Sequence, residues 1–385
     1  MIGELSMLRW IAAICLVLAP ATAQACTFCA GSALSRQTFR EYLHDSKFVA
    51  YGMLSDPKPD PSGLKGTTKF APSQLFKGTA PAGALVIPRY LPLIGRTPAD
   101  YLVFGTVDGS NVEPLYGVTA TAPMLAYLQD VAKLSKEKER AAERWKFYFE
   151  HLDAADPAVA ADAFLEFAKA PDAEIAGAKA IYSTTKLRRL MTDPNLPADR
   201  LGVFALMLGM CGTTEDERFL EKSLTAPLSD RVQPNVGGYL AGLTALNPTA
   251  GWTKIEAWAA DAKRPYAERL SAVGTMHYFQ AVKPTETKPQ VLKVIRALLA
   301  APELADLAVE DLRRWGWWDE TSAVLGLWMK PTHGGRLIRR AVVQYALVCP
   351  NPECKAFIAT VRRTDAKLVA TVEELLQIDA ENRKP

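Results

Sequence analysis

The stretch Leu201-Gly-Val-Phe-Ala-Leu-Met-Leu-Gly209 carries no polar or charged side chain. A run of this kind predicts a helix that is buried on every side. Cys211-Gly212 follows it, and residues 215–224 predict a second helix directly afterwards. Two helices joined by so short a connection form a helical hairpin. The rest of the chain can be compared with this unit.

The same unit recurs toward the C-terminus. The predicted pairs are residues 236–246 with 252–260, 267–280 with 290–299, 307–315 with 320–328, and 338–348 with 353–362. The first helices begin near residues 200, 234, 268, 304 and 337, so the steps are 34, 34, 36 and 33 residues. Even spacing of two-helix units is typical of an α-solenoid. Residues 158–168 with 172–178 predict an earlier, degenerate unit.

The part before the repeats has a different pattern. Residues 38–44 predict one helical turn, and short apolar runs follow at residues 48–54, 67–76, 84–87 and 100–106. Gly, Pro and Asp punctuate these runs, as at Lys77-Gly78 and Asp108-Gly109. Short strands at regular spacing with such turns predict a small β-barrel. The fold class is therefore α+β and multidomain, a small barrel followed by helical hairpins.

Four motifs carry a family resemblance. They are a Cys26-x-x-Cys29 start, Ser46-Lys-Phe-Val-Ala-Tyr-Gly52, Gln74-Leu-Phe-Lys-Gly78 and Asp100-Tyr-Leu-Val-Phe104. Over residues 26 to about 120 the chain resembles the netrin-like domain shared by tissue inhibitors of metalloproteinases and related bacterial secreted proteins, which implies an OB-fold barrel. The inhibitors begin Cys-x-Cys, pair both cysteines with distant ones and chelate zinc through the terminal amine. Here the spacing is Cys-x-x-Cys, and residues 30–120 contain no other cysteine.

The repeats resemble HEAT-like repeats, especially in Arg340-Ala-Val-Val-Gln-Tyr345. The whole arrangement is similar to exported proteins of unknown function from planctomycete-type bacteria. That resemblance implies no particular activity.

Residues 1–25 predict a signal peptide. Arg9 is followed by an apolar run from Trp10 to Pro20 and by the small-x-small sequence Ala23-Gln-Ala25. The run is too short to favour a transmembrane helix. Cleavage would leave Cys26 first, so a lipid anchor at Cys26 is an alternative, although Ala23 stands where a lipobox has Leu. We expect an exported protein, periplasmic or extracellular, with a barrel domain over 26–122 and a helical domain over 123–385.

The cysteines fit an oxidising compartment. Cys15 would leave with the signal. Cys26 and Cys29 form a candidate disulfide, redox pair or half of a metal site, whereas Cys349 and Cys354 bracket a turn and form a second candidate pair or two unpaired core positions. Cys211 lies in an apolar helix and is predicted to be a buried, inert thiol.

The charge balance and the absence of known catalytic motifs argue against several classes of function. The chain has 385 residues, 45 Lys and Arg, and 42 Asp and Glu, so its net charge of +3 argues against a strongly basic nucleic-acid binder. The sequence contains no GxSxG, HExxH, Walker or GxGxxG motif, and its four histidines are widely spaced. We therefore expect no enzyme, no cofactor and no metal.

One cluster is a candidate for binding a protein partner. Arg314, Trp315, Trp317 and Trp318 gather around a Gly turn, and Trp and Arg are favoured at binding hot spots. The alternative is that the rings wedge between adjacent repeats. The leading function is an exported, non-catalytic protein-binding or scaffold protein. Two alternatives remain, a metalloprotease inhibitor acting through Cys26, and a redox or metal-handling module using Cys26 and Cys29.

Overall fold

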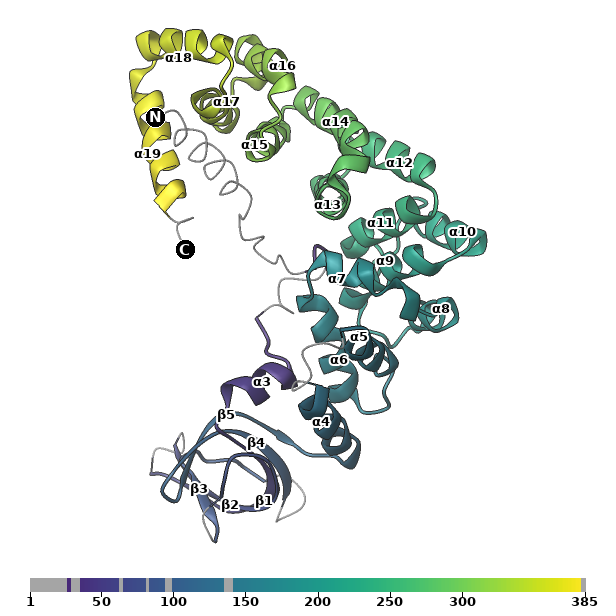
Figure 1. Ribbon diagram of the computed structural model, residues 1–385, viewed down its shortest axis with the longest axis vertical. Helices are drawn as coiled ribbons and strands as arrows, with labels where there is room; N and C mark the ends of the chain where they lie inside the picture. The colour runs from purple at the N-terminus through teal and green to yellow at the C-terminus, as the bar shows by residue number, and fades with distance from the viewer. Residues whose placement is uncertain are drawn as a thin grey trace, which may run out of the picture.

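The computed structural model describes residues 26–28, 35–61, 65–80, 83–93, 99–134 and 141–381. A small β-barrel is followed by a long helical region (Figure 1). The predictions for the signal peptide and for Cys29 fall outside the described residues. Within those residues, no helix combines the length and the apolar character needed to cross a bilayer.

Five strands close the barrel, in the order β1-β2-β3-β5-β4. Their bounds are β1 Phe48–Pro59, β2 Gly66–Lys77, β3 Leu85–Ile87, β4 Ala99–Asp108 and β5 Asn111–Thr119. All neighbouring pairs are antiparallel except β3 with β5. Buried side chains such as Phe48, Phe70 and Val103 fill the interior, so the predicted small barrel is confirmed.

Helix α3 (Phe39–Asp45) precedes β1 and is capped at both ends. Thr38 and Glu41 form a reciprocal capping box at its start. At its end, Lys77 Nζ donates to the carbonyl oxygens of Leu43 at 2.6 Å and His44 at 3.1 Å. Lys77 belongs to β2, so this contact ties α3 to the barrel wall.

The helical region begins with α4 at Ala122. Its helices are α4 Ala122–Leu134, α5 Ala141–Glu150, α6 Pro157–Lys169, α7 Asp172–Gly177, α8 Thr184–Thr192, α9 Leu201–Cys211, α10 Thr214–Ser223, α11 Val236–Leu246, α12 Pro248–Ala260, α13 Tyr266–Val282, α14 Pro284–Ala300, α15 Ala305–Trp315, α16 Thr321–Gly326, α17 Arg336–Val348, α18 Pro352–Thr364 and α19 Ala366–Glu381.

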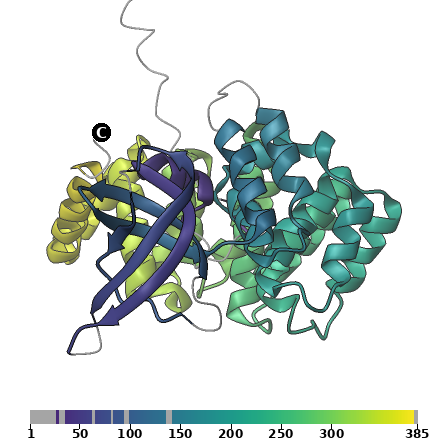
Figure 2. The same ribbon diagram turned by 90° about the horizontal axis from the view of Figure 1, so that it is seen from below.

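From α9 onward the helices follow one another along a curved arc. Figure 1 shows α9, α11, α13, α15 and α17 on its inner side and α10, α12, α14, α16 and α18 on its outer side. Seen from below, the barrel lies beside the teal helices and in front of the yellow-green C-terminal helices (Figure 2). Buried apolar side chains form one cluster that extends from Cys26 to Val372. The helical region thus has a continuous core, and the barrel interior has its own.

The apolar run that predicts a buried helix is α9, and residues 201–209 are all buried. It packs directly against α11 because glycines meet across the contact. A Cβ atom built on Gly238 would lie 2.0 Å from the carbonyl oxygen of Gly202, and one on Gly209 would lie 2.3 Å from Cα of Gly242. The two backbones therefore approach more closely than any side chain at these positions would permit.

This contact predicts an asymmetric result for two glycine-to-alanine changes. Gly238→Ala should lower the free energy of unfolding by about 2 kcal/mol or more, because the methyl group forces α9 and α11 apart. Gly274→Ala in α13 is the matched control, since its Cβ would meet nothing within 4 Å. It should be neutral or stabilise by up to about 1 kcal/mol through helix propensity. Urea denaturation measures both, and equal effects would contradict the close packing.

Candidate functional site

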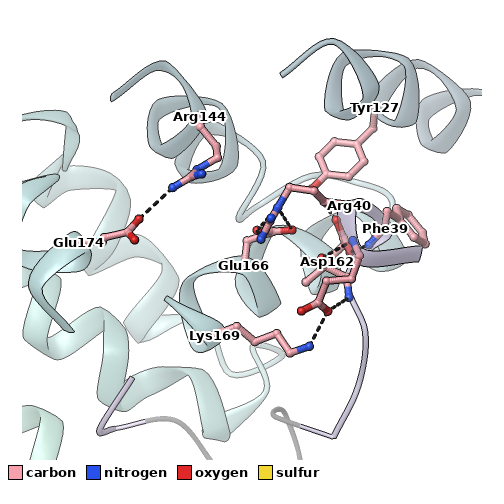
Figure 3. Close-up of polar contacts among 10 residues, drawn as sticks. Phe39, Arg40, Tyr127, Arg144, Asp162, Glu166, Lys169 and Glu174 are labelled. Carbon is pink, nitrogen blue, oxygen red and sulfur yellow. Dashed lines mark hydrogen bonds and ion pairs between the residues drawn. The ribbon is translucent and has the colours of Figure 1, made fainter. Parts of the chain in front are cut away.

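The barrel side of the chain is held on the helical region by a buried polar junction between α3 and α6 (Figure 3). Arg40 of α3 donates from Nε and Nη2 to Glu166 Oε2 at 3.0 and 2.9 Å, and from Nε to Oε1 at 3.1 Å. The Glu166 side chain is 1% exposed. Such charge-assisted bonds, made from a planar guanidinium, fix orientation as well as distance.

Asp162 lies one turn before Glu166 on the same face of α6. Its Oδ1 accepts from the backbone N–H of Phe39 at 2.6 Å, and its Oδ2 accepts from the Tyr127 hydroxyl of α4 at 2.8 Å. Burial raises the pKa of Asp162 to about 7, against the lowering effect of the Phe39 hydrogen bond. At the far end of α6, Lys169 pairs with Glu41 at 2.5 Å. Three residues of α6 therefore contact α3.

The charged groups of the junction are hydrogen-bonded or paired with one another. The carboxylates of Asp162 and Glu166 already accept from α3 and α4, and Arg144 of α5 is paired with Glu174 at 2.9 Å. Within the described ranges, no group of three or more His, Cys, Asp or Glu residues could hold a metal ion. The Tyr148 hydroxyl is buried and finds no partner in this part of the chain.

The predicted tryptophan cluster is half-buried and lies between neighbouring helices. The rings of Trp315 and Trp317 have centroids 4.8 Å apart, and Lys288 Nζ of α14 lies 5.0 Å from the Trp317 centroid. Trp318 contacts Tyr345 of α17 edge-on at 5.1 Å. This placement corresponds to the alternative in which the rings wedge between repeats.

Arg314 differs from the three tryptophans because its side chain is exposed. Its side chain is 60% exposed, pairs with Glu310 at 2.7 Å, and lines a groove of about 320 Å³. The residues that line the groove belong to α15, α17 and α19. Figure 1 shows where these three helices lie. Its lining mixes apolar and charged side chains: Asp306, Leu307, Glu310, Arg314, Leu337, Arg340, Ala341, Gln344, Leu375 and Asp379. Sequence reasoning identified Arg314 but not the groove.

The described cysteines are all free thiols. Cys26 is buried at 3% exposure, in the core of the helical region rather than in the barrel. Cys349 and Cys354 are buried with hydrogen-bonded thiols, and burial raises the pKa of Cys354 to about 12. Cys211 is half-buried at the end of α9, less enclosed than predicted, and burial raises its pKa to about 11.

Comparison with known proteins gives no relative. No family model matches the chain, and neither a curated protein nor a solved structure matches it.

The junction predicts a stability that depends on pH. The pKa of Asp162 is raised in the folded state, so the folded chain binds more protons than the unfolded chain. Stability should fall by up to about 1.4 kcal/mol per pH unit as pH rises from about 4 toward 7, and then level off. Glu166, Arg40, Tyr127 and Tyr148 face this carboxyl.

Asp162→Asn keeps an acceptor for Phe39 and removes the titration. The variant should lose this component of the pH dependence in urea denaturation between pH 4 and 8. An unchanged slope would show that Asp162 titrates normally. Asp130→Asn, on the exposed side of α4, serves as the control and should leave the slope as it is.

Proposed function

We propose that this chain is an exported, non-catalytic protein that binds a protein partner and acts as a scaffold. One observation carries the proposal, the groove between α15, α17 and α19. It combines an exposed apolar side chain, Leu337 at 58% exposure, with charges of both signs. Protein interfaces characteristically pair an apolar centre with a polar, charged rim.

The proposal includes the finer fold assignments. We assign the barrel to the OB-fold of netrin-like domains, which the strand order β1-β2-β3-β5-β4 supports. We assign the helical region to an α-solenoid of HEAT-like hairpins, which the alternation of inner and outer helices supports. Solenoids expose extended inner surfaces that bind other proteins.

The two alternative functions gain no support from the placement of Cys26. An inhibitor of the kind suggested by the resemblance needs a terminal residue that projects to the protease zinc, whereas Cys26 is buried against the helical core. A redox or metal role needs an accessible thiolate. Burial of Cys26 also disfavours a lipid anchor, because a thioether-linked lipid has no room there.

Site-specific photo-crosslinking tests the groove. A photoreactive residue at position 337, in the groove, should crosslink to a protein in the cells that produce this chain. The same residue at position 355, on an exposed site of α18, is the control and should give no such adduct. Arg340→Glu should reduce the adduct at 337 at least about tenfold, because it reverses a groove charge. Equal crosslinking at 337 and 355 would refute the proposal.

A second test separates the tryptophans from the groove. Trp317→Ala should lower the thermal unfolding midpoint, because the ring packs on Trp315 and Lys288. It should leave crosslinking from position 337 unchanged below that midpoint. Loss of the adduct without loss of stability would instead assign the partner-binding role to the tryptophan cluster.

A further inference from the structure

The segment Cys26–Phe28 lies on the inner side of the helical region. The Phe28 ring has its centroid 5.2 Å from that of Tyr278 in α13. It also covers Gly237 of α11, where a Cβ would lie 3.2 Å from the ring atoms Cδ1 and Cε1. A pocket of about 330 Å³ adjoins Phe28 and is lined by residues of this segment, α11 and α13. The first residues of the predicted mature chain thus pack against α11 and α13 of the same chain.

Asp172, the first residue of α7, anchors this segment. Its Oδ1 accepts from the Thr27 backbone N–H at 3.1 Å, and its Oδ2 accepts from the Thr27 hydroxyl at 2.5 Å. Asp172 is 7% exposed. Among the ion pairs formed by the described residues, none includes Asp172. Both oxygens are hydrogen-bonded, but the negative charge has no counter-ion there, and a buried carboxylate normally has one.

We propose that the α-ammonium group of Cys26, released when the signal peptide is removed, is the counter-ion of Asp172. Hydrolysis of the Ala25–Cys26 amide by one water gives the carboxylate of Ala25 and the α-ammonium of Cys26. Thr27 N lies 3.1 Å from Asp172, and successive backbone nitrogens are under about 4 Å apart. The Cys26 nitrogen is therefore within about 7 Å of the carboxylate. Processing would thus lock the N-terminal segment onto the helices.

The groups around Asp172 leave this role open to the amine. Tyr278 of α13 faces it, and the thiol of Cys26 lies near Tyr278 and Tyr182. Burial raises the pKa of both tyrosines above their ordinary value, so they are neutral. Glu174, two residues further along α7, is already paired with Arg144. None of these groups is a cation available to Asp172, and burial raises the pKa of Asp172 itself.

The ion pair has a defined pH window. A carboxylate neighbour raises the pKa of the α-amine above its ordinary value of about 8. The stabilisation is then complete below the unfolded pKa of the amine and is lost as pH rises through its folded pKa. On the acid side it is lost as Asp172 becomes protonated. The stabilisation should therefore be largest between the pKa of Asp172, which burial raises, and the folded pKa of the amine.

The experiment compares two full-length mature chains, one beginning at Cys26 and one beginning at Ala25-Cys26. Both are released from an N-terminal fusion by a site-specific protease, each with and without Asp172→Asn. The chain beginning at Cys26 should unfold at a midpoint higher by about 2 °C or more at neutral pH. The difference should vanish in the Asp172→Asn pair and above the folded pKa of the amine.

A second measurement covers the case in which Asp172→Asn does not fold. The rate of α-amine acetylation by acetic anhydride, followed against pH by peptide mass spectrometry, reports the pKa of the amine in the Cys26-first chain. A value above about 8 supports the pair. An ordinary value, equal midpoints for the two chains, or a difference that persists in Asp172→Asn overturns it.

This inference rests on the export proposed above, and the two fail separately. The intact mass of the exported protein shows at which residue it begins. A mass that corresponds to a chain with another first residue refutes cleavage before Cys26. The recombinant comparison decides the ion pair independently of that result.

Discussion

Two carboxylates one helical turn apart, Asp162 and Glu166, set the arrangement of the molecule. Both are buried on α6, and burial of a carboxylate is costly unless donors or cations satisfy it. Helix α3 supplies them, through the Phe39 N–H and the Arg40 guanidinium. Two residues separate α3 from β1, and Lys77 of β2 holds its other end. If α3 moved away from α6, these buried acids would lose their hydrogen-bond donors. The contact therefore fixes the position of the barrel relative to α6.

The same logic extends to the next helix. Asp172 of α7 is also buried, and Thr27 satisfies both of its oxygens. Three buried acids on α6 and α7 thus depend on residues 27–40. A boundary at 122/123 falls where α4 begins, but these contacts cross it. The helical region is therefore energetically incomplete without the N-terminal segment. A fragment that begins at residue 123 would lose the donors from Thr27, Phe39 and Arg40, and would keep only the Tyr127 hydroxyl for Asp162.

Features of the fold are predictable from the sequence where residues close together in the chain determine them. The apolar run of α9 and the even spacing of the hairpins are readable because neighbouring residues carry them. Strand β5 is not predicted because polar residues and Pro114 interrupt it, and α8 is not predicted because it is short and rich in polar residues. Helix α19 lies beyond the last predicted hairpin. Helix α14 begins at Pro284, before the predicted residue 290, and Pro289 lies inside the helix. The junction was not predictable, since Phe39 and Asp162 are 123 residues apart and an acid on a helix is usually solvated.

Two parts of the inner row differ in what already covers them. At α11 and α13, Phe28 fills the glycine-lined surface and the chain is its own ligand. At α15, α17 and α19, the groove leaves Leu337 exposed among Arg314, Arg340 and Asp379. Transfer of an exposed leucine side chain from water into an apolar contact is favourable. A partner that covered Leu337 would gain this free energy. The N-terminal segment therefore covers α11 and α13, whereas the groove proposed to bind a partner lies beyond α13.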